Sequence, residues 1–219
     1  MSNKPKIAVV LSGCGVQDGA EIHEAVMTLL ALDRLGAEAV CFAPDVPQRD
    51  VINHLTGESM AESRNVLVEA ARIARGAITS LADFKAAAVD AMIFPGGFGA
   101  AKNLCAFAVE GPGCAVEPTV EAAIRSMHAA GKPIGALCIA PALLARVLGR
   151  GSVTIGQDAE TARAVEAMGA RHCPTHHGEV VVDHELRIAT APCYMLESTL
   201  SEIAADAEAV VRALLSLRA

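Results

Sequence analysis

The amino-acid sequence predicts a doubly wound α/β domain, in which helices cover both faces of a mostly parallel sheet. Strand-like and helix-like segments alternate almost throughout the 219 residues. The strand-like segments are short and apolar along their whole length, which is typical of parallel strands buried on both faces. No repeat, low-complexity tract or linker interrupts this order, so residues 1–219 are predicted to form a single domain.

Five elements are indicated in the first hundred residues. The β-branched run at 6–11 predicts the first strand, and apolar residues at helical spacing predict a helix at 20–35, which a glycine ends. The apolar run at 39–43 is the next predicted strand. A second helix is predicted at 60–75, again up to a glycine, and a fully apolar strand at 91–94 runs into a glycine-rich turn.

The same alternation continues beyond residue 100. A helix at 117–130 ends at a glycine, a strand follows at 133–137, and a proline opens a helix at 141–148. A short strand is predicted at 153–155 and a helix at 157–168. A hairpin around a polar turn and a closing helix are predicted at residues 179–182, 187–190 and 196–217. Two stretches are expected to be loop insertions, at 44–59 and 105–118.

The composition excludes several classes of partner. The chain has 18 basic and 25 acidic residues, a formal charge of −7, and no dense cluster of lysine and arginine. The sequence therefore predicts no positively charged surface that would bind nucleic acid or anionic lipid. Its apolar runs are too short to span a membrane. The first residues lack the apolar segment of a secretory signal, so we expect a cytoplasmic location.

The cysteines predict neither a disulfide framework nor a structural zinc site. There are seven of them, an odd number, without any C-x-x-C pair or zinc-finger spacing. One reactive thiol among several buried ones is the pattern we expect.

Four polar or glycine-rich segments follow predicted strands, at residues 12–19, 95–99, 138–141 and 156–158. Ligands of open parallel sheets bind at this carboxyl edge. The first segment joins a strand to a helix, but its G-x-G-x-x-x-G spacing is one residue too long for dinucleotide binding, and the acidic residue expected after the next strand is missing. No Walker A sequence is present either, so the sequence predicts no nucleotide cofactor.

Cys138 is the candidate nucleophile. It directly follows a buried strand, and Pro141 then opens a helix, so the cysteine occupies a tight strand-to-helix turn. Ala136 and Ala140 supply the small residues that a nucleophile elbow requires. The free N–H groups of a helix N-terminus favour a thiolate, so we expect a lowered thiol pKa. The alternative is a buried, inert cysteine.

The glycine-rich turn at 95–99 is the candidate oxyanion hole. Gly96 and Gly97 let the backbone direct N–H groups toward a neighbouring site, and the N–H of Gly97 together with that of Ile139 could bind a developing negative charge. Such a turn can also be a tight connection only.

The nucleophile needs a partner that moves its proton, and no histidine follows Cys138 within about 20 residues. Glu21 and His23, at the start of the first helix, are the best-placed candidates. A protonated Glu21 carboxyl could donate a hydrogen bond to the thiolate. Glu24 is the alternative if the helix begins in another register, and acidic residues also occur in first turns for the macrodipole alone.

Two other polar groups favour a structural interpretation. His172, Cys173, His176 and His177 could bind a metal, but solvated histidines on an exposed loop are the favoured interpretation, and no metal site is predicted. Arg64 could bind a substrate carboxylate, although a solvated helix face is the more common role of such a residue.

Longer runs of the sequence resemble a known superfamily. Residues 95–104 and 135–144 are similar to the PfpI and class I glutamine amidotransferase-like superfamily. Within it, residues 12–26, 51–58 and 64–67 resemble the ElbB family, the isoprenoid biosynthesis glyoxalases. The resemblance implies a flavodoxin-like three-layer sandwich and a homodimer. It also places Cys138 at the elbow of the superfamily, with Glu21 as its acidic partner.

The resemblance implies a cofactor-free glyoxalase of low activity that turns glyoxal, a small aldehyde, into glycolate. Cys138 would add to the aldehyde, and Glu21 or His23 would move a proton between the two carbons. A non-catalytic alternative is a thiol that senses oxidants or binds a partner. Glutamine hydrolysis is disfavoured, because Ile139 and Gly156 stand where many relatives carry a histidine.

Overall fold

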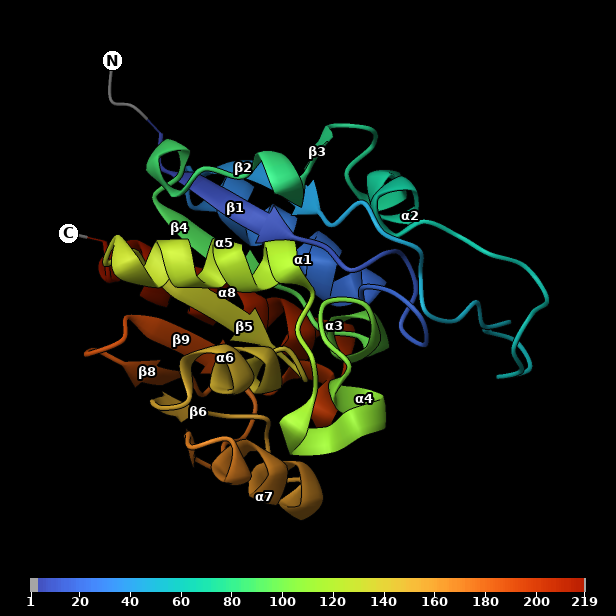
Figure 1. Ribbon diagram of the computed structural model, residues 1–219. Helices are drawn as coiled ribbons and strands as arrows, with labels where there is room; N and C mark the ends of the chain where they lie inside the picture. Colours follow the sequence, from blue (N-terminus) through green and yellow to red (C-terminus); the bar gives the residue numbers. More distant parts are fainter. Residues whose placement is uncertain (1–3, 219) are drawn as a thin grey trace.

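The structure of the protein is a computed structural model, which describes residues 4–218 (Figure 1). A seven-stranded sheet forms its centre, in the order β3-β2-β1-β4-β5-β9-β8. All neighbouring strands are parallel except β8, which runs antiparallel to β9. The strands of this sheet are β1 (Lys6–Val10), β2 (Glu38–Ala43), β3 (Ile78–Ser80), β4 (Ala91–Phe94), β5 (Ile134–Leu137), β8 (Val181–Asp183) and β9 (Ile188–Ala191). A separate pair is formed by β6 (Ser152–Val153) and β7 (Arg171–His172).

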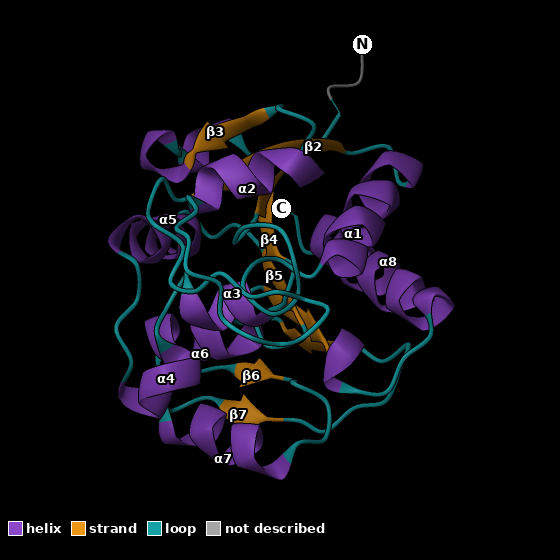
Figure 2. Cartoon of the chain, turned by 90° about the vertical axis from the view of Figure 1, so that its right-hand side faces the viewer, coloured by secondary structure: helices purple, strands orange, loops and turns teal. Residues whose placement is uncertain are grey.

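Helices cover both faces of the sheet. They are α1 (Ile22–Arg34), α2 (Val66–Ile73), α3 (Phe98–Lys102), α4 (Phe107–Glu110), α5 (Pro118–Ala129), α6 (Pro141–Leu148), α7 (Ala159–Ala167) and α8 (Leu200–Ser216). Figure 2 shows α1 and α8 on one side of the sheet and α5 and α6 on the other. This arrangement confirms the predicted flavodoxin-like α/β sandwich.

The two cores follow from the alternation of side chains along the strands. Val10 and Phe94 face the core beneath α5 and α6, whereas Val9 and Ile93 face the core beneath α1 and α8. Both sets are fully buried. A strand that is apolar on both faces must be covered on both faces, which is why continuous apolar runs predicted a sandwich.

Several predicted elements differ from the structure. The helix predicted at 60–75 begins only at Val66, because the Asn65 side chain caps it by accepting a hydrogen bond from the Val68 N–H at 3.0 Å. The predicted strand at 153–155 is shorter and leaves the main sheet to pair with β7, which was not predicted. The short strand β3 was also missed, and the predicted loop at 105–118 contains α4.

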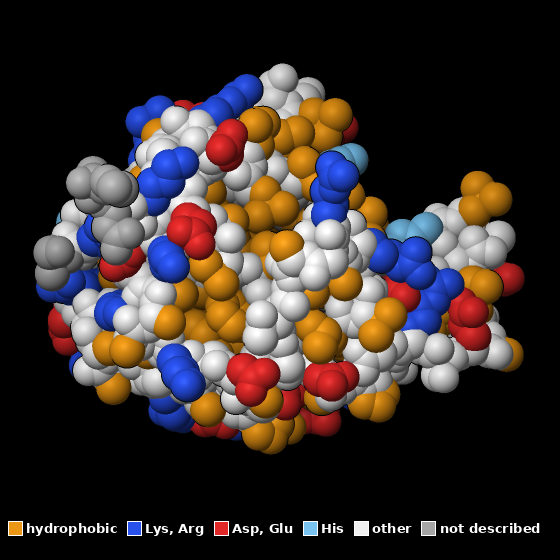
Figure 3. All heavy atoms as spheres, turned by 90° about the horizontal axis from the view of Figure 1, so that it is seen from above, with side chains coloured by type: hydrophobic (Ala, Val, Ile, Leu, Met, Phe, Trp, Pro, Cys, Tyr) orange, Lys and Arg blue, Asp and Glu red, His pale blue; other side chains and the backbone are white. Residues whose placement is uncertain are grey.

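The residues before α2 form an extended arm, residues 49–64. An isolated antiparallel bridge joins Ile52 to Ser59 across it. Figures 1 and 3 show this arm projecting from the body of the molecule. Among the described residues, no helix combines the length and apolarity needed to cross a membrane.

Candidate functional site

Cys138 lies where β5 ends and α6 begins, at the carboxyl edge of the sheet. Its φ is +57°, in the left-handed region that few non-glycine residues adopt. Its N–H donates to the Ala191 carbonyl of β9 at 3.1 Å, which fixes the turn against the neighbouring strand. Such strain clusters at functional sites. The strand-to-helix turn predicted at this residue is therefore present.

The glycine-rich turn after β4 presses against this cysteine. A Cβ on Gly96 would lie 2.5 Å from the Cys138 Cβ, and a Cβ on Gly97, whose φ is +91°, would lie 2.4 Å from the Glu21 nitrogen. Only glycine fits either position. The backbone N–H groups of Gly97 and Ile139 reach the Cys138 sulfur and act to lower its pKa. These are the two donors that the sequence predicted for an oxyanion.

The carboxyl beside the sulfur belongs to Glu24, not to Glu21. Glu24 is fully buried on α1 and forms a hydrogen bond with Cys138. Its Oε2 accepts from the Gly96 N–H at 2.7 Å, and its Oε1 accepts from the Tyr194 N–H at 3.3 Å. Burial raises the pKa of Glu24 to about 8.

The register of α1 explains this correction. Glu21 is the residue before the helix, and its Oε2 caps the first turn by accepting from the Glu24 N–H at 2.7 Å. Glu24 is the third residue of the helix and lies one turn further on, where its side chain reaches the sulfur. Glu21 is still part of the site, because it lines the cavity onto which Cys138 opens.

The Cys138 thiol pKa is raised well above its ordinary value, which reverses the lowering expected from the helix N-terminus. Burial is the main cause, and the neighbouring Glu24 carboxylate is the second. The N–H groups of Gly97 and Ile139 offset these effects only in part. A Cys138 thiolate and a Glu24 carboxylate would repel each other. The pair therefore resists losing its last proton, so at least one of the two groups tends to stay protonated.

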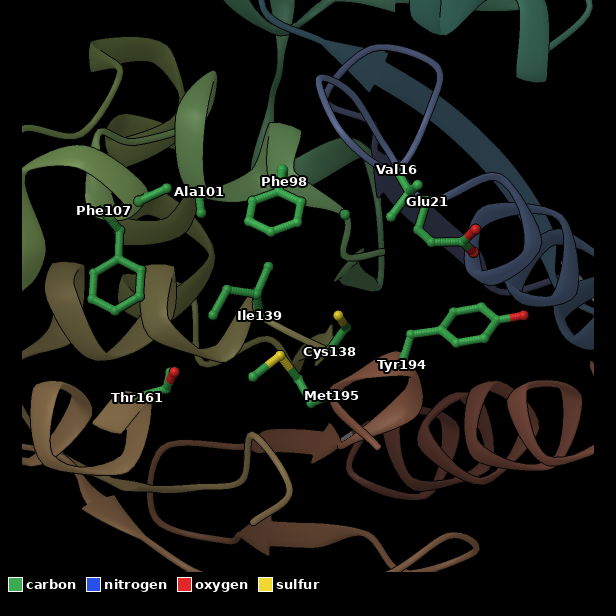
Figure 4. Close-up of a pocket in the computed structure, with 12 residues that line it drawn as sticks. Val16, Glu21, Phe98, Ala101, Phe107, Cys138, Ile139, Thr161, Tyr194 and Met195 are labelled. Atoms are coloured by element: carbon green, nitrogen blue, oxygen red, sulfur yellow. The ribbon is translucent and has the colours of Figure 1, made fainter. Parts of the chain in front are cut away.

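The sulfur opens onto a cavity of about 370 Å³ (Figure 4). Most of its lining side chains are apolar. The lining residues are Val16, Glu21, Gly97, Phe98, Ala101, Phe107, Ala108, Cys138, Ile139, Thr161, Tyr194 and Met195. A small molecule bound there would meet Cys138 and Glu21 at one end and aromatic and aliphatic groups elsewhere.

His23 lies beside the site without lining the cavity. Its Nδ1 forms a hydrogen bond with the Tyr194 hydroxyl at 2.8 Å and lies 3.8 Å from Glu21 Oε1. Tyr194 was not predicted from the sequence. It follows β9, the strand paired with β5, so only the long-range pairing brings it beside Cys138.

The remaining candidates are structural. In the part of the chain that the structure describes, no group of three or more metal-ligating side chains is found. His177, expected to be solvated, instead bonds through Nδ1 to the buried Asp206 at 2.9 Å, which raises its pKa against the opposing effect of burial. Arg64 pairs with Glu62 and Glu69 and does not line the cavity.

Comparison with known proteins identifies the class to which this fold and site belong. The model of the DJ-1/PfpI family matches residues 8–204, so the chain belongs to the DJ-1/PfpI family, within the class I glutamine amidotransferase-like superfamily. It is 52% identical to human "Glutamine amidotransferase-like class 1 domain-containing protein 3, mitochondrial", over 97% of this chain and 83% of that protein. It is 51% identical to the rat "ES1 protein homolog, mitochondrial", over 98% and 84%.

A solved structure is also close. The crystal structure of an isoprenoid biosynthesis protein with an amidotransferase-like domain from Ehrlichia chaffeensis is 35% identical, with a TM-score of 0.90, and covers 96% of this chain and 99% of that one. The comparisons correct one prediction. The expected cytoplasmic location is contradicted, because the human and rat relatives are both named as mitochondrial proteins.

Proposed function

We propose that this protein is a cofactor-free glyoxalase of the ElbB type, which converts glyoxal into glycolate with Cys138 as nucleophile. The observation that carries the proposal is the buried contact between Cys138 and Glu24 at the end of an apolar cavity. A carboxyl whose pKa is about 8 is suited to general base catalysis near neutral pH, because it both accepts and returns a proton readily.

In the first step the Cys138 sulfur forms a bond to one aldehyde carbon. The thiol proton passes to the Glu24 carboxylate, and the electron pair of the C=O bond moves onto oxygen. The N–H groups of Gly97 and Ile139, which reach the sulfur, are positioned to stabilise that oxygen. Glu24 then returns the proton to the oxygen, which completes a hemithioacetal.

In the second step a proton leaves the sulfur-bearing carbon and another is added to the neighbouring carbon. Glu21 lines the cavity and is the base that we assign to this transfer, in preference to His23, which lies outside the cavity. The sulfur-bearing carbon is oxidised to a thioester as its neighbour is reduced to an alcohol. Water then hydrolyses the thioester, which releases glycolate and restores the thiol. These steps use only side chains and water.

The experiment is glyoxal turnover by the purified protein and its Cys138→Ala variant. We expect the variant to lose glycolate formation. Cys41→Ala is the matched control, since Cys41 is another cysteine with 7% exposure but lies on β2, away from the cavity. Full turnover by Cys138→Ala would reject the proposal.

A second candidate function uses the same sulfur to sense oxidants. It is supported by the opening of Cys138 onto the cavity, through which a small peroxide could reach it. Negligible glyoxal turnover together with rapid, selective oxidation of Cys138 would favour this role over catalysis. We also retain as predictions the homodimer, tested by light scattering, and the lack of nucleic-acid and membrane partners, tested by filter binding and vesicle sedimentation.

A further inference from the structure

The cavity beside Cys138 is much larger than glyoxal needs. Its volume is about 370 Å³, whereas an apolar cavity of about 150 Å³ is enough to bind benzene. Glyoxal has only four non-hydrogen atoms and would leave most of this space unfilled. A site that discriminates by contact has to fill its cavity with substrate, so the size of this one indicates a bulkier molecule.

The chemistry of the lining indicates what that bulk consists of. Beyond the sulfur, Phe98, Phe107, Ile139 and Met195 point into the cavity from different elements, as Figure 4 shows. Phe98 belongs to α3 and Phe107 to α4, so the apolar wall is built by several segments together. An apolar group of a ligand would be removed from water against these side chains.

The same lining disfavours a negatively charged ligand. Neither lysine nor arginine is among the described residues that line the cavity, and the charged residue there is Glu21. Lys102, on α3, does not line the cavity: its Nζ lies over the Phe98 ring, 5.5 Å from the ring centroid, and is paired with Asp50 at 3.0 Å and with the Gln17 carbonyl at 3.3 Å. A carboxylate entering the cavity would be desolvated without a partner and would face Glu21.

Further space adjoins the cavity between α4 and α7. A second hollow, of about 330 Å³, shares Phe107, Ala108 and Thr161 with the first. Asp158 and Glu160 lie on its rim, so the outward path also carries acidic side chains. A ligand longer than glyoxal therefore has room to extend, provided that its far end is not an anion.

We propose that the substrate is an uncharged 2-oxoaldehyde that carries an apolar group, of the size of a benzene ring or larger, on its ketone carbon. This inference rests on the proposed glyoxalase function. The reaction balances as it does for glyoxal: the aldehyde carbon is oxidised to a carboxylate, the ketone carbon is reduced to an alcohol, and one water is consumed.

The test compares kcat/KM for phenylglyoxal and glyoxal with the full-length protein. Burial of an aromatic ring predicts that phenylglyoxal is favoured at least about tenfold. If kcat/KM for glyoxal equals or exceeds that for phenylglyoxal, this inference is overturned, whereas the proposed glyoxalase function is retained. Turnover of neither compound would remove both.

A variant tests the placement of the apolar group. Ala108 lines both hollows from α4, and Ala108→Trp should narrow the path, so we expect the ratio of kcat/KM for phenylglyoxal over glyoxal to fall at least about tenfold. Ala205→Trp is the matched control. Ala205 is an exposed alanine on α8 that lines neither hollow, and this variant should keep the wild-type ratio. An unchanged ratio in Ala108→Trp would contradict the placement.

A binding readout separates charge from size. Benzyl alcohol and benzoate are of similar size, but only benzoate is an anion. We expect benzyl alcohol to slow the alkylation of Cys138 by iodoacetamide and benzoate to leave it unchanged at the same concentration. Equal protection by benzoate would overturn the exclusion of anions, whatever the turnover measurements show.

Discussion

The buried Glu24 carboxyl should make the stability of the protein fall with rising pH, and Glu24→Gln should remove that fall. In the folded protein burial raises the pKa of Glu24 from 4.5 to about 8. Below pH 4.5 both the folded and the unfolded chain hold this proton. Between the two values the folded chain still holds it after the unfolded chain has released it, so each rise in pH favours unfolding.

The magnitude follows from the interval between the two pKa values. At about 1.4 kcal/mol for each pH unit, the whole interval corresponds to about 5 kcal/mol. Between pH 5.5 and pH 7.5 the expected loss is about 2.5 kcal/mol, because both ends of that range lie between the two pKa values. Glutamine has nearly the same shape and no titrating proton, so the variant should lack this contribution.

Urea denaturation at a series of pH values measures the effect. We expect the unfolding free energy of the wild type, relative to that of Glu24→Gln, to decrease by about 2.5 kcal/mol from pH 5.5 to pH 7.5. Glu121→Gln is the matched control, because Glu121 is also an acidic residue in the first turn of a helix but lies on α5 and is not among the groups that shift the Glu24 pKa, so this variant should keep the wild-type trend. Parallel pH profiles for the wild type and Glu24→Gln would refute the reasoning.

Two further predictions concern the surroundings of the site. Gly96→Ala should destabilise the protein by about 2 kcal/mol or more in urea denaturation, because the added Cβ would lie 2.5 Å from the Cys138 Cβ. Gly113→Ala is the control: its added Cβ would meet no atom within 4 Å, so this variant should unfold like the wild type. Asp206→Ala should cost about 3 kcal/mol, because it removes the buried acceptor of His177, and thermal unfolding that leaves Tm unchanged would contradict this.

The fold and the reactive turn could be predicted because they depend on local patterns. Continuous apolar runs define the buried strands, and Cys138 lies between such a run and a proline that opens a helix. The two donors at Gly97 and Ile139 follow from the same short segments. No knowledge of distant contacts is needed for these features.

The identity of the acidic partner could not be settled in this way. The choice between Glu21 and Glu24 depends on where α1 begins, and Glu21 serves as its cap rather than as part of its first turn. Helix boundaries are the least predictable feature of a sequence. Tyr194 could not be found at all, because its position depends on the pairing of β9 with β5.

The thiol pKa was predicted in the wrong direction for a related reason. The helix N-terminus was expected to lower it, but burial and the Glu24 charge outweigh the donors at Gly97 and Ile139. Neither the depth of Cys138 nor the identity of its neighbour is visible in a local pattern. The sequence therefore identifies Cys138 as the candidate nucleophile but does not predict the direction in which its thiol pKa is shifted.

The most direct test of catalysis by Cys138 is intact-mass analysis of the protein rapidly mixed with glyoxal and quenched in acid. The account predicts a transient increase by the mass of one glyoxal, located on Cys138 by peptide mapping, absent in Cys138→Ala and slower to form in Glu24→Gln. Glycolate formation without any adduct on this cysteine would contradict it.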